Sequence, residues 1–420
     1  MNLLLLSTTT GYQARSFGEA ARALGMRVVF GTDRCHVLED PWQDAALPLR
    51  FEDPADSAQR IADRALQEPI AAVVAVGDKP ALTAALACRK LGLPWHPPSA
   101  AEACHDKVRA RGLFRQAGLN VPEFHAISIR DGAEAALRYA RLPCVLKPAS
   151  LSGSRGVIRV DTPRQLADAF QRIAALLNSP DVQVRKDATT ETVLVEEFIP
   201  GREFAVEAVM ERGCLKVLAI FEKPDPLDGP FFEETIYVTP PRLEAEERGR
   251  LLDCLARAVG VLGLFHGPLH AEFRANNLGV WPLEIAARPI GGLCSRALRF
   301  DVLGRAEKMP LEELLVRNGL GLPLDGIERE GAASAVMMVP IPAAGVYQGV
   351  DGVEEARAIP GVEEIRITAK PGEKLVPWPE GASYPGFIFA RAETSAGAEG
   401  AVRQAHQRLR FRIQHALAVV

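Results

Sequence analysis

The first hundred residues alternate short apolar runs with amphipathic helical patterns. Apolar runs at Leu3–Ser7, Arg27–Gly31 and Ile70–Val76 predict strands, and a helical pattern over Pro80–Leu91 follows the last of them. Such an alternation predicts a parallel sheet covered by helices. The loop Thr8–Tyr12 follows the first strand, where open α/β sheets bind ligands, but it lacks the G-x-G-x-x-G pattern of dinucleotide-binding proteins. A nicotinamide or flavin cofactor is therefore not favoured.

The chain changes character after the proline-rich stretch 94–98, which marks the end of a predicted N-terminal domain at residues 1–98. One helix is predicted over Ala100–Ala117. From about Leu142 onward, apolar runs separated by glycine and proline predict hairpins. A last helix is predicted over Ala398–Ala416.

Composition excludes several classes of protein. The 420 residues suggest two or three domains at roughly 150 residues each, and 48% apolar with 24% charged residues is typical of a globular chain. A net charge of −4 argues against nucleic acid as a partner. No apolar run approaches the roughly 20 residues that span a membrane. Seven scattered cysteines without a C-x-x-C pair favour a reducing compartment, so a cytoplasmic protein is expected.

Two acidic residues lie on neighbouring predicted strands, in His270–Arg274 and Leu283–Arg288. A hairpin centred on Leu278 places Glu272 directly opposite Glu284. Like charges in that position are destabilising unless a cation lies between them, and Mg²⁺ commonly takes one or two carboxylates plus substrate phosphates. The alternative is a pair of solvated surface acids.

A lysine precedes a loop rich in serine and glycine. Lys147 ends an apolar run, and the loop Ser150–Arg155 follows it. Free backbone N–H groups beside a lysine are suited to binding phosphates, although such a loop can also be an ordinary hairpin turn. The composition predicts a loop that is mobile without nucleotide, with Arg155 drawn toward the phosphates and open to trypsin.

Two further segments are unremarkable when each is taken alone. Val195–Glu203 is a strand followed by a Pro-Gly turn, and Lys107 is a lysine at the start of a helical run. Together and in this order, the four segments resemble those of the ATP-grasp superfamily over essentially the whole chain. The resemblance implies an α/β ATP-grasp fold. It has a Rossmann-like domain at 1–98, a two-lobed ATP-binding region at 99–325 with a small lobe at about 140–203, and a C-terminal α+β subdomain at 326–420.

The resemblance also implies roles for particular residues. Those assigned to ATP are Lys107, Lys147, Ser152, Gly153, Ser154, Glu196, Glu197, Phe198, Ile199 and Glu203. Glu272 and Glu284 are assigned to Mg²⁺, with Mn²⁺ as an alternative ion, and Arg288 is the catalytic arginine near the transferred phosphate. Many family members carry Asn two residues after the second metal glutamate. Ala286 stands there in this chain, which implies thinner metal coordination.

Within the superfamily, Phe232–Pro240 and the tail from Gly352 resemble the L-amino-acid (dipeptide) ligase branch. The likeness implies that Glu234 lines the amino-acid site, with Tyr237 where a histidine often falls. The glycines that follow Arg288 are also assigned to substrate, and they are Gly291 and Gly292.

The activity implied is that of a carboxylate–amine ligase, which joins a carboxylic acid or amino acid to an amine or amino acid through an acyl phosphate. It releases ADP and phosphate. The expected partners are these small molecules, without nucleic acid or membrane, and a homodimer stays open. The alternatives are a biotin-carboxylase-like or purine-pathway enzyme, or an ATP-binding protein without catalysis.

Overall fold

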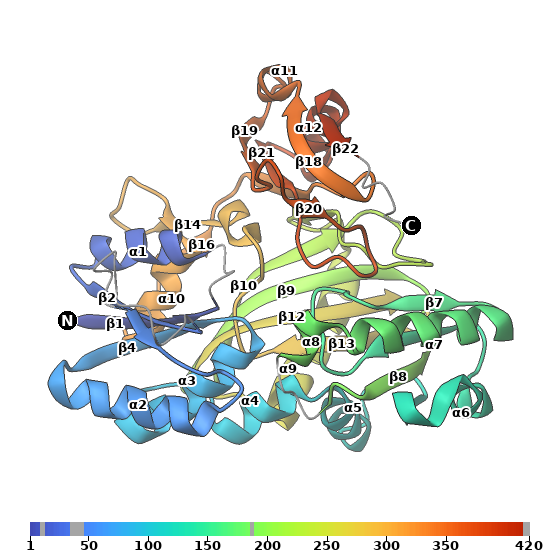
Figure 1. Cartoon of the computed structure of the whole chain (residues 1–420). Coiled ribbons are helices and arrows are strands. Elements are labelled where there is room, and N and C mark those ends of the chain that lie inside the picture. The colour runs from blue at the N-terminus through green and yellow to red at the C-terminus, as the bar shows by residue number, and fades with distance from the viewer. Residues whose placement is uncertain (9–12, 34–45, 185–188, 415–420) are drawn as a thin grey trace.

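The computed structural model describes all residues except 9–12, 34–45, 185–188 and 415–420. The predicted ligand-binding loop Thr8–Tyr12 therefore lies mostly outside the described residues. Figure 1 shows a blue N-terminal part on one side, a green lobe on the other, a broad central sheet between them and an orange-red C-terminal part above. Among the described residues, no helix is long and apolar enough to cross a membrane.

The N-terminal part is a parallel four-stranded sheet in the order β3-β2-β1-β4, as predicted. Its elements are β1 (Asn2–Ser7), α1 (Ala14–Ala23), β2 (Arg27–Thr32), β3 (Ala46–Pro48), α2 (Pro54–Gln67), β4 (Ile70–Val76) and α3 (Asp78–Leu91). The leucines of β1 alternate between its faces. Leu3 and Leu5 share a core with Phe17 of α1, whereas Leu4 and Leu6 share one with Ile61 of α2. Both faces of the sheet are therefore covered by helices.

The helix predicted over Ala100–Ala117 is two helices, α4 (Pro98–His105) and α5 (Lys107–Gln116). Asp106 causes the break, because its carboxylate accepts the backbone N–H groups of Val108 and Arg109 at 2.9 and 3.0 Å. Such a side-chain cap starts a new helix. Lys107 is consequently the first residue of α5.

The green lobe is an antiparallel sheet in the order β5-β8-β6-β7, packed against helices. Its elements are β5 (Phe124–Ser128), α6 (Gly132–Tyr139), β6 (Cys144–Pro148), β7 (Ile158–Val160), α7 (Pro163–Leu177), α8 (Pro180–Gln183) and β8 (Thr192–Glu197). Leu146 of β6 and Val195 of β8 share a buried core with Phe170 of α7. Lys147 and Glu196 alternate with these core residues, so they lie on the opposite face of the sheet.

The central sheet has eight strands in the order β13-β12-β9-β10-β11-β17-β21-β19. The strands are β9 (Arg202–Glu211), β10 (Cys214–Lys223), β11 (Ile236–Thr239), β12 (Gly267–Asn276), β13 (Gly279–Ala286), β17 (Ala333–Met338), β19 (Val362–Ile367) and β21 (Gly386–Ala392). The helices α9 (Ala245–Leu262), α11 (Val353–Arg357) and α12 (Ser395–Arg408) accompany it. All its pairings are antiparallel, as the hairpin pattern predicted.

Apart from two short 3-10 helices, Ile129–Asp131 and Cys294–Ala297, the remaining elements form two small sheets and a helix. They are β14 (Arg299–Val302), β15 (Met309–Pro310), α10 (Leu311–Gly319), β16 (Ile327–Arg329), β18 (Gly345–Asp351), β20 (Lys374–Leu375) and β22 (Arg410–Gln414). The predicted helix Ala398–Ala416 is wrong beyond Arg408, and its last two residues lie outside the described part of the chain. Residues 410–414 form a strand because Phe411 and Ile413 alternate toward the core around Tyr347. The domain limits at residues 98 and 325 stay a prediction.

Candidate active site

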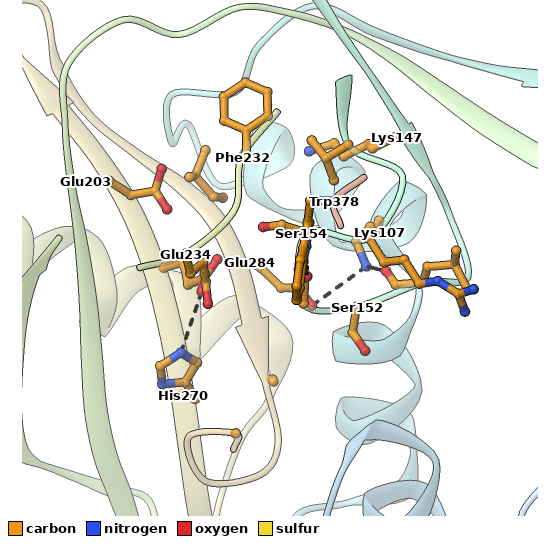
Figure 2. A pocket seen from close by; sticks show the side chains of 18 of the residues that line it. Lys107, Lys147, Ser152, Ser154, Glu203, Phe232, Glu234, His270, Glu284 and Trp378 are labelled. Atoms are coloured by element: carbon orange, nitrogen blue, oxygen red, sulfur yellow. Dashed lines mark hydrogen bonds and ion pairs between the residues drawn. The ribbon is translucent and has the colours of Figure 1, made fainter. Parts of the chain in front are cut away.

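One cavity of about 360 Å³ lies between the green lobe, the central sheet and the C-terminal part. It brings together every residue that the sequence predicted for the site. They are Lys107, Lys147, Ser152, Gly153, Ser154, Glu196, Glu197, Phe198, Ile199, Glu203, Glu234, Tyr237, Glu272, Glu284, Arg288, Gly291 and Gly292. In Figure 2, Glu203, Glu234 and His270 lie on one side of the view and Lys107 and Lys147 on the other, with Trp378 between them.

The predicted pairing of Glu272 with Glu284 is confirmed: the two residues are directly opposite each other on β12 and β13. The turn differs from the prediction, because Asn276 pairs with Gly279 and not with Val280. A bulge restores the register, since Glu272 faces Glu284 while Phe273 already faces Pro282. The extra residue is Leu283. The bulge thus places the two carboxylates opposite each other at the cavity.

A lysine that the sequence did not single out neutralises one of these carboxylates. Lys223, the last residue of β10, places its Nζ 2.7 Å from Glu203, 2.6 Å from Glu234 and 3.1 Å from Glu272. The three glutamates each offer an oxygen within 4.8 Å of the others. The ammonium group therefore occupies the centre of a cluster of carboxylates that could otherwise hold a metal ion. Glu284 is outside this cluster and has Lys107 at 3.7 Å.

Burial and charge shift the pKa values of this cluster in different directions. Burial raises the pKa of Glu234 to about 7, and the nearby Glu272 adds to the rise, while Lys223 opposes it. Burial also acts on Glu272, but Lys223 and His270 outweigh it and hold the pKa of that carboxyl well below its usual value. Glu272 is therefore a charged carboxylate at neutral pH, while Glu234 lies near the midpoint of its titration.

His270 is a second residue whose role the sequence left open. Its Nδ1 lies 3.1 Å from Glu207, which is fully buried, and its Nε2 lies 3.7 Å from Glu272. Burial alone would lower the pKa of His270, but the two glutamates outweigh burial and raise it to about 9. A protonated imidazole in the cavity wall thus stabilises the charged carboxylate of Glu272.

On the opposite wall, Lys147 forms an ion pair with Glu196. The Arg111 guanidinium also contacts Glu196, with its Nε 3.0 Å from Oε1, and it donates to the carbonyls of Pro282 and Leu283 at 3.1 and 2.7 Å. Burial would raise the pKa of Glu196, but Arg111 and Lys147 lower it to about 2. Arg111 therefore connects α5 with β8 and with the bulge of β13. It also fixes Glu196, and Glu196 in turn holds the Lys147 ammonium in place at the cavity.

Replacing Lys147 with alanine should weaken ATP binding about 10- to 100-fold, which corresponds to about 1.4–2.7 kcal/mol. The free energy of unfolding should change little, because Arg111 still neutralises Glu196. Calorimetric titration with ATP measures the first effect and urea unfolding the second. Lys90→Ala, an exposed lysine on α3, is the control. Equal ATP affinity in Lys147→Ala and the parent would remove Lys147 from the phosphate site.

The loop Ser150–Arg155 and the glycine after it are hydrogen-bonded to residues Trp378–Glu380 of the C-terminal part, which argues against the expectation that the loop is mobile without nucleotide. The Trp378 indole donates to the carbonyl of Gly153 at 3.2 Å, and Gly156 N donates to the carbonyl of Pro379 at 2.7 Å. Arg155 borders the cavity, but its side chain is already paired within the protein. Its Nε donates to the carbonyl of Glu380 at 2.9 Å and its Nη2 pairs with Asp181 at 2.8 Å. The contacts of Gly153 and Arg155 with the C-terminal part could not be predicted from the sequence, because they join residues 225 positions apart and go to backbone carbonyls, which every residue carries.

Trypsin is therefore expected to spare the bond after Arg155 even without nucleotide, because the arginine side chain is buried and paired. Trp378→Ala should increase cleavage there at least about 10-fold by releasing Gly153. Mass spectrometry of the fragments measures both results. Trp281→Ala, on β13 and outside the cavity, is the control. Rapid cleavage of the parent protein after Arg155 would contradict the attachment.

Comparisons with known proteins find related domains in the N-terminal, middle and C-terminal parts of the chain. Family models match an ATP-grasp N-terminal domain at residues 18–95, an ATP-grasp domain at 140–297 and the L-amino acid ligase C-terminal domain 2 at 337–414. The crystal structure of L-amino acid ligase from Bacillus licheniformis superposes with a TM-score of 0.80 at 26% identity and covers 99% of both chains.

Curated relatives match with lower coverage. Alanine–anticapsin ligase of Bacillus subtilis is 29% identical over 49% of this chain and 46% of its own length. D-alanine–D-alanine ligase B of Chromobacterium violaceum is 28% identical over 55% of this chain and 72% of its own length. The chain thus spans less than half the length of the alanine–anticapsin ligase. The chain thus contains ATP-grasp domains, which family models match in successive regions, and over its full length it resembles an L-amino acid ligase.

Proposed function

We propose that the chain is an ATP-dependent carboxylate–amine ligase that forms an amide or peptide bond through an acyl phosphate and releases ADP and phosphate. The observation that carries this proposal is the convergence of lysines, opposed glutamates and Arg288 on one cavity. The full-length likeness to an L-amino acid ligase supports it.

ATP is proposed to lie between the green lobe and the central sheet. Lys107, Lys147 and the loop Ser152–Ser154 line the cavity where they can contact its phosphates. The proposed adenine site is bordered by Glu196–Ile199, at the end of β8 and in the turn after it. The proposed ribose site is bordered by Glu203 of β9. Phosphoryl transfer depends mainly on positioning and on neutralisation of charge, and these side chains supply both.

Mg²⁺ fits the opposed pair of carboxylates. Glu272 and Glu284 face each other across two strands, and two carboxylates with substrate phosphates are a common magnesium environment. The ion would neutralise developing charge on the phosphates when bound. Ala286 offers no ligand atom, so the two glutamates would hold the ion without a third side chain at that position.

The substrate acid and amine are proposed to bind at the other end of the cavity, beside Glu234 and Tyr237. The substrate carboxylate attacks the γ-phosphorus of ATP, and ADP leaves. The amine then attacks the acyl carbon, loses a proton, and displaces phosphate. Glu234 can accept that proton, because its pKa is about 7. Gly291 and Gly292 leave space for the substrate, and a Cβ at Gly291 would meet nothing within 4 Å.

A matrix of amino acids and other carboxylic acids, each combined with amino acids and simple amines, tests the proposal. Phosphate release that requires both an acid and an amine, with ADP and an amide found by mass spectrometry, is the expected result. Phosphate release with bicarbonate alone would instead favour a carboxylase. AMP as the product, or no acid–amine pair that increases turnover, would contradict the proposal.

A further inference from the structure

The side chain of Arg288 is held by a residue from the N-terminal part of the chain. Its Nε lies 2.8 Å from Oδ1 of Asp78, and its Nη1 donates to the carbonyl of Pro289 at 3.0 Å. Both charged side chains are largely buried, with 14% of Arg288 and 22% of Asp78 exposed. The ion pair joins residues 210 positions apart, which excludes a merely local contact.

The position of Asp78 follows from the parallel sheet. It is the first residue of α3 and follows Gly77, whose φ of +100° turns the chain sharply after β4. A carboxylate at the start of a helix is stabilised by the helix dipole. Burial would raise the pKa of Asp78, but Arg288 outweighs burial and the pKa falls to about 2. Asp78 is therefore charged at neutral pH.

The backbone that carries Arg288 is fixed independently of Asp78. Gln13, which precedes α1, donates from Nε2 to the carbonyls of Ile290 and Gly292 at 2.7 and 3.0 Å. Glu207 accepts the N–H of Ile290 at 3.1 Å. Removal of the Asp78 carboxylate should therefore free the Arg288 side chain and leave the loop in place.

Two further carboxylates, those of Glu284 and Glu272, would attract the Arg288 guanidinium away from a bound phosphate. Glu284 and Glu272 act on Arg288 in the same direction as Asp78 and favour its charged form. Both are the proposed magnesium ligands. A guanidinium released from Asp78 would face these two carboxylates and compete with the ion for them.

We propose that Asp78 is a positioning residue for Arg288. It holds the guanidinium by Nε and keeps it from the metal-binding glutamates, so that the remaining N–H groups face the transferred phosphoryl group. A residue at the carboxyl end of a strand of the N-terminal sheet thereby contributes to phosphoryl transfer in the neighbouring cavity. This inference rests on the proposed ligase function, because it assigns Arg288 to the phosphoryl group.

Binding of ADP with aluminium fluoride and Mg²⁺, a mimic of the transferred phosphoryl group, tests the inference without a substrate acid. Asp78→Ala should bind ADP alone as the parent does but should lose about 10- to 100-fold of its affinity for ADP–aluminium fluoride. Asp78→Asn separates charge from hydrogen bonding, since it keeps an acceptor for Nε. Asp53→Ala removes the matching carboxylate at the start of α2, which accepts the N–H of Asp56 at 3.1 Å, and should change neither affinity.

Turnover gives a second readout. Asp78→Ala should lower kcat with little change in the KM for ATP, and it should release more than one phosphate per amide, because a poorly held acyl phosphate meets water. Asp78→Glu should recover part of the loss. Parent-like ADP–aluminium fluoride affinity, or an equal loss for ADP alone, would overturn the positioning role. A parent protein that forms no amide with any pair would instead overturn the proposed function.

Discussion

Glu272→Gln or Glu284→Gln is expected to lower kcat about 10³-fold or more, or about 4 kcal/mol of transition-state stabilisation. Each change removes one of the two opposed carboxylates proposed to hold Mg²⁺. Glu284→Gln also relieves repulsion between the pair, so the melting temperature should hold or rise slightly. Steady-state kinetics across a Mg²⁺ series measures the effect.

Glu211→Gln is the matched control, because Glu211 ends the neighbouring strand β9 and does not line the cavity. It should leave kcat unchanged. Near-normal turnover of Glu284→Gln at saturating Mg²⁺ would remove Glu284 from the metal ligands.

Lys223→Met is expected to lower the free energy of unfolding by about 3–5 kcal/mol, because it leaves buried carboxylates without their cation. Lys223 is 3% exposed in its side chain and contacts Glu203, Glu234 and Glu272. Loss of the ammonium raises the folded-state pKa of Glu234 and Glu272, both of which Lys223 lowers in the parent protein. Stability should therefore be highest below their unfolded pKa and fall as the pH rises through the raised values, so the deficit should be larger at pH 8 than at pH 5.5.

Urea unfolding at the two pH values measures this deficit. Lys216→Met is the control, since Lys216 lies on the same strand but contacts only the carbonyl of Leu324 among the partners that the structure describes. The account would be contradicted if the loss in unfolding free energy were equal at both pH values, or no larger than that of the control. Lys223 would then not be the cation that stabilises the three carboxylates.

Local patterns predicted much of this protein. The alternation of apolar runs with helical patterns predicted the parallel N-terminal sheet, and the turn Asn276–Gly279 between two strand-like runs predicted the β12–β13 hairpin with Glu272 opposite Glu284. The bulge at Leu283 could not be predicted, because the one residue that it adds offsets the difference between the predicted turn and the observed one, in which Asn276 pairs with Gly279. The break at Asp106 had a local signal, since an aspartate before a lysine-led helix is a good N-cap.

The residues that sequence reasoning missed act over long separations. Lys223 lies between glutamates of three other segments, and Asp78 contacts Arg288 from 210 residues away. Nothing in a single sequence distinguishes such a lysine or aspartate from a surface one. Only the fold brings the carboxyl ends of the N-terminal strands against the loop that follows β13.

The central claim is that a substrate carboxylate is activated as an acyl phosphate. It is tested most directly with the acid–amine pair found in the matrix, the acid being labelled with ¹⁸O in its carboxyl group. Attack of that carboxylate on ATP followed by displacement by the amine predicts phosphate that carries ¹⁸O, with ADP and the amide formed in equal amounts. Phosphate without the label, or label recovered in AMP, would contradict the account.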